Sequence, residues 1–67
     1  MKKLWVYCTD IRTLKICNKY SEDGLDYQDE EYSGYLNFKG KEDFHEFLEE
    51  TKNCEDLSSD GLFFNSN

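Results

Sequence analysis

Acidic side chains dominate the middle of the chain. Between Lys19 and Lys39 the sequence contains no lysine or arginine. The carboxylates in this interval are Glu22, Asp23, Asp26, Asp29, Glu30 and Glu31. Tyrosines, including Tyr27 and Tyr32, are interleaved with them. Carboxylates pair with guanidinium groups, and tyrosine rings offer large, fairly rigid contact area on which cations can stack. We therefore expect this segment, with Tyr27 and Tyr32, to bind a basic partner.

A second group of acids falls on one side of an expected helix. Stepping about 100° per residue places four of them opposite the apolar stripe of that helix. These four are Glu42, Glu46, Glu49 and Glu50. They predict either a secondary acidic binding face or simply a solvated helix surface.

Metal and catalytic motifs are absent from the sequence. The acids of residues 23–31 do not reproduce the spacing of an EF-hand calcium loop, although weak cation binding is a rival interpretation of the loop. The single histidine, His45, and the dispersed Cys8, Cys17 and Cys54 give no zinc-ligand pair. No nucleophile elbow, phosphate loop or dinucleotide turn is present. We expect a protein that is not an enzyme, with no catalytic residues, no metal and no cofactor.

Size and charge narrow the class further. A chain of 67 residues predicts one domain, residues 1–67, whose aromatic residues supply the core. The net charge of −7 disfavours direct binding to nucleic acid and favours a basic protein. The short apolar run at residues 4–8 is shorter than a signal-peptide core or a membrane span. We therefore expect no membrane partner, reduced thiols and a cytoplasmic location.

The first residues favour two strands. Residues 4–8 and 13–17 are rich in β-formers, and a loop at residues 10–12 would pair Cys8 with Leu14 and Val6 with Ile16. This register places Leu4, Val6, Cys8, Leu14 and Ile16 on the buried face and Trp5, Tyr7, Lys15 and Cys17 on the other. Cys8 and Cys17 would then lie on opposite faces, where no disulfide can form. An exposed Trp5 and Tyr7 would suit a homodimer interface, unless the sheet is covered on both faces or the register is wrong.

The rest of the chain predicts a loop, a strand, a helix and a last strand. The segment after Tyr20 lacks helical periodicity, and strand pairing resumes near Glu31, with Leu36 and Phe38 pointing inward. A helix opens at residues 40–43 and ends at residues 52–53; its core stripe is Phe44, Phe47, Leu48 and Thr51. A turn at residues 58–61 precedes a short strand at residues 62–64 and a frayed end at residues 65–67. The expected fold class is α+β: a small antiparallel sheet, in the order β-β-β-α-β, packed against one amphipathic helix.

In size, charge and acidic character, the chain resembles the small inhibitors that phages encode against host defence systems, including anti-CRISPR proteins and other DNA mimics. The resemblance is carried by the −7 charge, the Glu22–Glu31 acids with their tyrosines, and the acidic helix face. It implies a phage inhibitor in the host cytoplasm that presents carboxylates where a CRISPR nuclease or complex would bind phosphates. The alternative is a small adaptor or immunity-type protein that neutralises a basic toxin or regulates a host enzyme.

Overall fold

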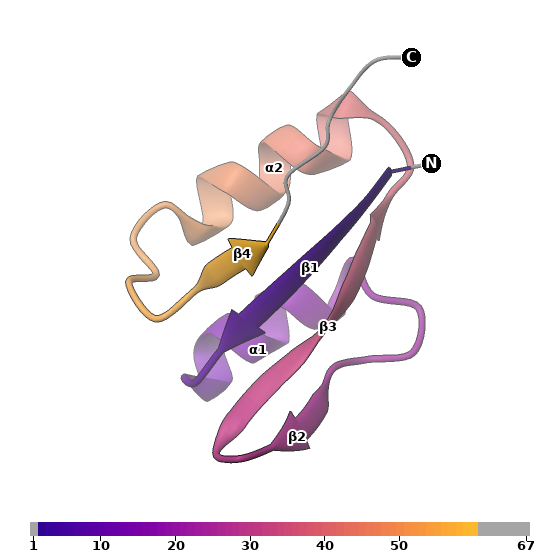
Figure 1. Cartoon of the computed structure of the whole chain (residues 1–67). Helices are drawn as coiled ribbons and strands as arrows, with labels where there is room; N and C mark the ends of the chain where they lie inside the picture. Colours follow the sequence, from indigo (N-terminus) through magenta and orange to yellow (C-terminus); the bar gives the residue numbers. More distant parts are fainter. Residues whose placement is uncertain (1, 61–67) are drawn as a thin grey trace.

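In the part of the chain that the structure describes, six elements follow one another in the order β-α-β-β-α-β (Figure 1). The computed structural model describes residues 2–60 of the chain. The elements are β1 (Lys2–Cys8), α1 (Ile11–Asn18), β2 (Asp26–Gln28), β3 (Glu31–Phe38), α2 (Lys41–Thr51) and β4 (Ser58–Asp60). This element order is that of the ferredoxin-like, or split β-α-β, motif. The predicted α+β class with a small antiparallel sheet is confirmed, whereas the prediction of a single helix is wrong, because the described residues form two.

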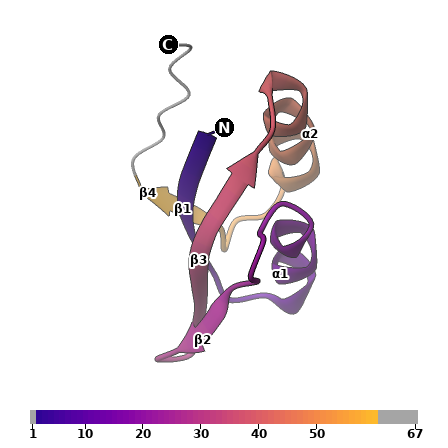
Figure 2. The same cartoon turned by 90° about the vertical axis from the view of Figure 1, so that its right-hand side faces the viewer.

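The four strands form one antiparallel sheet in the order β2-β3-β1-β4. The first strand of the chain is therefore central, with β3 on one side and β4 on the other. Both helices cover the same face of this sheet, and within residues 2–60 the opposite face carries no helix (Figure 2). Alternate residues of each strand consequently point either into the core or onto this open face.

The core forms where the two central strands meet the helices. Leu4 of β1 is paired with Leu36 of β3, and both are buried. Phe38 contacts the rings of Phe44 and Phe47 of α2, each with ring centroids 5.3 Å apart. Full burial of such a side chain stabilises a fold by about 1.5–3 kcal/mol, so three packed phenylalanines suit a chain this short. The inward orientation predicted for Leu4, Val6, Cys8, Leu36 and Phe38 is confirmed, since all five are buried.

The loop predicted at residues 10–12 and the strand predicted at residues 13–17 are wrong, because Ile11–Asn18 is the helix α1. Asp10 caps it by accepting a hydrogen bond from the Arg12 backbone N–H at 2.8 Å. Thr13 and Cys17 are four residues apart and both are buried, which gives the helix its inner side. The predicted pairing of Cys8 with Leu14 is also wrong, since β1 pairs with β3 and β4 instead.

The second helix lies where the sequence places it, with Phe44, Phe47 and Thr51 buried. Leu48, predicted in the core stripe, is 44 % exposed. The three buried residues span an arc of about 60° around the helix, and Leu48 lies about 40° beyond its edge at Phe44. The buried face of α2 is therefore too narrow to include Leu48.

The two edge strands are both short. The turn predicted at residues 58–61 is wrong for Ser58–Asp60, which is β4. At the other edge, the predicted loop after Tyr20 contains β2, so pairing resumes at Asp26, earlier than predicted; β3 begins at Glu31. The strand predicted at residues 62–64 and the frayed end at residues 65–67 lie outside the described residues.

Candidate functional site

The β2–β3 hairpin presents a run of acids at one end of the molecule (Figure 1). Gln28 pairs with Glu31, so only Asp29 and Glu30 form the turn. Both have positive φ angles, 55° and 66°. Two-residue hairpin turns require this backbone, and they favour Asn-Gly or Asp-Gly over a glutamate. The left-handed conformation costs a non-glycine residue about 1–2 kcal/mol. An acidic turn is thus kept at some cost in stability.

The predicted contact acids lie in two groups. All six of them are exposed. Asp29, Glu30 and Glu31 lie at the tip of the hairpin. Glu22, Asp23 and Asp26 instead border a hollow beside the sheet. Within residues 2–60 none of the six forms an ion pair or a side-chain hydrogen bond. Their charges therefore remain available to a partner.

The predicted tyrosines point away from these acids. Tyr27 and Tyr32 are paired across β2 and β3, with ring centroids 4.8 Å apart. Strand alternation places both on the helix side of the sheet, whereas Asp26 and Glu31 belong to the open face. The structure therefore does not bring Tyr27 and Tyr32 onto one surface with Asp26 and Glu31.

The acids of α2 form a separate surface. Glu42, Glu46, Glu49 and Glu50 are exposed, as the helical spacing predicts. Helix α2 lies at the opposite end of the molecule from the β2–β3 hairpin in both views (Figures 1 and 2). Glu50 is partly neutralised, since it accepts hydrogen bonds from Lys19 Nζ at 2.8 Å and from the Tyr20 hydroxyl at 3.3 Å. The hydrogen bond from Lys19 lowers the pKa of Glu50. The acids of α2 and those of the hairpin tip are thus on separate parts of the surface.

Aromatic side chains occupy the open face of the sheet. Trp5 and Tyr7 of β1 lie there, as predicted for the face opposite Val6, and Trp5 is paired with Tyr35 of β3. The Trp5 ring meets Tyr35 edge-on, with centroids 4.7 Å apart, and meets Tyr7 at 6.1 Å. Lys3 Nζ lies 5.4 Å from the centre of the Tyr35 ring. Of this open-face aromatic cluster (Trp5, Tyr7 and Tyr35), the sequence predicted Trp5 and Tyr7 as a candidate homodimer interface, and none of the three was part of the predicted acidic site.

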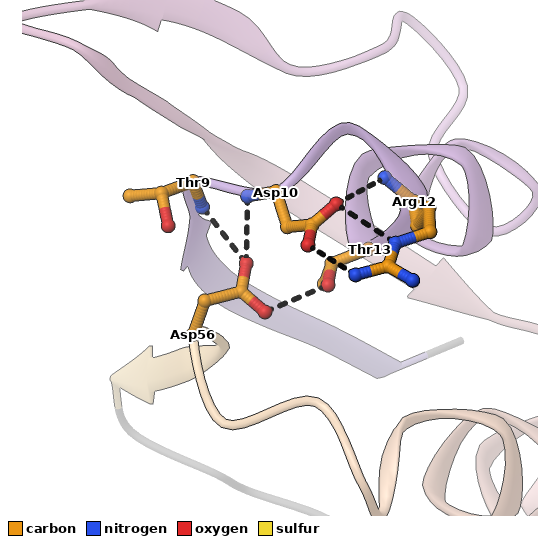
Figure 3. Close-up of polar contacts among 5 residues, drawn as sticks. All are labelled: Thr9, Asp10, Arg12, Thr13 and Asp56. Atoms are coloured by element: carbon orange, nitrogen blue, oxygen red, sulfur yellow. Dashed lines mark hydrogen bonds and ion pairs between the residues drawn. The ribbon is translucent and has the colours of Figure 1, made fainter.

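Asp56 is the other residue that the sequence did not reveal (Figure 3). Its carboxylate accepts hydrogen bonds from the backbone N–H groups of Thr9, at 2.9 Å, and Asp10, at 2.8 Å. It also accepts one from the Thr13 hydroxyl at 2.8 Å. Burial acts to raise the pKa of Asp56, but these hydrogen bonds together outweigh it and lower the pKa. Asp56 thereby fastens the segment before β4 to the start of α1.

A hollow of about 470 Å³ lies over this fastening, bordered by Asp10, Arg12, Cys54 and Asp56 among others. It is larger than the hollow beside Trp5, which has about 250 Å³. Two carboxylates that border this hollow already have partners. Asp10 forms an ion pair with Arg12 at 3.0 Å, and Asp56 accepts hydrogen bonds at the start of α1. We therefore assign the residues around this hollow a structural role, the attachment of the segment before β4 to α1.

The cysteines are closer together than predicted. Cys8 and Cys17 are both buried, so their placement on opposite faces is wrong. Each of the two thiols contributes to the pKa shift of the other. Burial raises the pKa of Cys8 to about 11 and that of Cys17 to about 12. Both thiols are therefore protonated at neutral pH, and Cys54 is half-buried after α2.

His45 is exposed on α2, with its ring against Phe44. Across residues 2–60, no group of three or more His, Cys, Asp or Glu side chains could hold a metal ion. In the same part of the chain, no helix has the length and apolarity needed to cross a membrane.

Comparison of the chain with protein-family models, with curated proteins and with solved structures found no match. We therefore infer the function from the acidic and aromatic surfaces described above.

Proposed function

We propose that this protein is a non-enzymatic inhibitor that binds a basic nucleic-acid-binding protein, such as a CRISPR nuclease or complex, through its acidic hairpin. The observation that carries the proposal is the hairpin tip, where Asp29, Glu30 and Glu31 are exposed and without internal counter-charges. A nucleic-acid channel already binds spaced negative charges with its arginines and lysines. Carboxylates on a projecting turn are suited to occupy such a channel.

The strained turn gives this proposal a second support. Backbone strain persists where the surrounding structure enforces it, and it gathers at binding sites. A glycine at position 30 would relieve the left-handed backbone and simplify the turn. A glutamate there instead adds charge at the most projecting point of the hairpin. A contact role for that charge accounts for its presence.

The test uses a variant that should raise the stability of the fold but weaken its binding to the partner. Asp29→Asn with Glu30→Gly converts the turn to Asn-Gly, and we expect the free energy of unfolding to rise by about 0.5–1 kcal/mol. Affinity for a purified CRISPR effector, and inhibition of its DNA cleavage, should fall about tenfold or more. Glu46→Gln with Glu49→Gln removes the same charge from α2 and serves as the control. Undiminished inhibition by the Asn-Gly variant would contradict the proposed site.

Salt and competing DNA define the mode of binding. An electrostatic contact should weaken about tenfold or more as NaCl rises from about 0.05 M to about 0.5 M, because the Debye length shrinks. Duplex DNA should compete if the hairpin occupies the nucleic-acid channel. Tight binding with which DNA does not compete would favour the alternative, a protein that neutralises a basic toxin or regulates an enzyme away from any nucleic-acid site.

A further inference from the structure

The hollow on the open face of the sheet combines rings with carboxylates. Its lining includes Lys3, Trp5, Glu22, Asp23, Asp26 and Tyr35. Its volume is about 250 Å³. That is below the roughly 300–1,000 Å³ of typical small-molecule sites, and it suits a single long side chain.

The sheet side of the hollow is aromatic. Trp5 and Tyr35 pack edge-to-face at 4.7 Å, and Tyr35 stays 52 % exposed despite this contact. Lys3 already places an ammonium group 5.4 Å from the centre of the Tyr35 ring. The Tyr35 ring thus already interacts with a cation on the open side of the sheet, and a guanidinium that stacks on it would take the place of the Lys3 ammonium.

The loop side of the hollow is acidic. Glu22 and Asp23 belong to the loop before β2, and Asp26 is the first residue of β2 on the open face. A backbone hydrogen bond from Asn37 N–H to the Tyr20 carbonyl, at 2.7 Å, holds the start of this loop beside β3. Lys3 is the one basic residue among the lining residues named above, so the carboxylates exceed it and the hollow is negative.

We propose that this hollow binds an arginine side chain of the basic partner. A planar guanidinium can stack on Tyr35 while it donates to Asp23 or Asp26, and a lysine ammonium lacks that combination. The inference rests on the proposed function only in assuming that the partner is basic. It adds a second contact point, on the open face, to the hairpin tip.

A flat sheet face with aromatic rings is also a surface on which RNA-binding proteins stack bases. Here the three carboxylates border the rings, so a phosphate backbone following stacked bases would meet like charge. The observations therefore favour an arginine over a nucleotide.

Trp5 is the only tryptophan of the chain and borders the hollow, so its fluorescence reports occupancy. The probes are a nona-arginine peptide, a nona-lysine peptide and a single-stranded oligonucleotide. We expect the arginine peptide to change Trp5 emission and to bind about threefold or more tighter than the lysine peptide. Equal affinities, or an unchanged emission, would overturn the proposal. Tighter binding of the oligonucleotide would overturn it in favour of base stacking.

Two double variants that remove the same charge show where the arginine peptide binds. Asp23→Asn with Asp26→Asn should weaken the arginine peptide about fivefold or more, whereas Glu46→Gln with Glu49→Gln on α2 should change it less than about twofold. Unchanged urea midpoints in both variants confirm that they fold. Equal weakening by the two pairs would indicate diffuse attraction and overturn the arginine site. In that case the proposed function would still stand if the hairpin variant loses inhibition of the effector.

Discussion

The three cysteine thiols lie in different surroundings, which sets their order of reactivity. Cys8 and Cys17 are fully buried, and burial raises their pKa values to about 11 and about 12. Only the thiolate reacts with an alkylating agent. We expect iodoacetamide at about pH 8 to modify the half-buried Cys54 first, and the other two only after unfolding. Mass spectrometry of peptides from briefly labelled native protein checks this order; modification of Cys8 as fast as Cys54 would contradict it.

Asp56 offers a test of how one side chain supports the fold. The Asp56→Asn variant replaces one acceptor oxygen by an N–H₂ group that faces existing donors. We expect a loss of about 1–3 kcal/mol in the free energy of unfolding, measured with urea. Glu55→Gln changes the same charge at an exposed neighbour and should cost little. A similar loss in both variants would show that the carboxylate's hydrogen bonds are not the cause.

The same residue predicts a pH dependence. The pKa of Asp56 in the folded state lies below its ordinary value of 3.8, so the carboxylate stabilises the fold above that pH. This stabilisation is lost as the pH falls through the folded pKa. The difference in stability between the native chain and Asp56→Asn should therefore be full near neutral pH and shrink below about pH 4. Urea titrations at several pH values measure it, and a difference that grows on acidification would contradict the assignment.

At the scale of elements, two glycines distinguish a crowded position from an open one. A Cβ added at Gly34 of β3 would lie 3.3 Å from Leu25 Cγ, in the loop that borders the hollow. Gly34→Val should therefore displace this loop and cost about 1–3 kcal/mol. Gly40, before α2, has open space around it and no side-chain cap. Gly40→Ser should be neutral or stabilising by a few tenths of a kcal/mol. Thermal unfolding compares the two, and an equal loss would refute the crowding at Gly34.

The elements differ in how far the sequence predicts them. Helix α2 has a clear helical spacing at Phe44, Phe47 and Thr51, and β3 alternates over residues 35–38, so both are found. Helix α1 has only eight residues, and the spacing of its apolar residues Leu14, Ile16 and Cys17 fits either period. Besides the cap by Asp10, its start is stabilised by Asp56, which is 46 residues from Asp10 along the chain. No local pattern reports such a contact.

The sequence likewise predicted only part of the candidate site. Exposure of the six acids follows from their charge, which composition reveals. The division into hairpin tip and hollow depends on the pairing of β2 with β3, and β2 has only three residues. The Trp5–Tyr35 contact likewise depends on the pairing of two strands far apart in the sequence. Such partners become visible only when the sheet order is known.

For the molecule as a whole, self-repulsion opposes folding. The net charge is −7, and the ion pairs found among residues 2–60 are exposed, so each contributes little. Added salt screens the repulsion over distances beyond about 10 Å at 0.1 M. We expect the urea midpoint to rise between about 0.01 M and about 0.3 M NaCl. A midpoint that falls would mean that specific ion pairs outweigh the overall charge.

The central place of β1 has a consequence for synthesis of the chain. β1 is synthesised before its neighbours in the sheet, β3 and β4, which follow from residues 31 and 58 onward. Until β4 leaves the ribosome, the edge of β1 that it covers has no partner strand, and Trp5, Val6 and Tyr7 lie along that edge. Unpaired apolar edges promote association between chains. Nascent chains arrested before Ser58 should therefore be the form of this protein that chaperones bind.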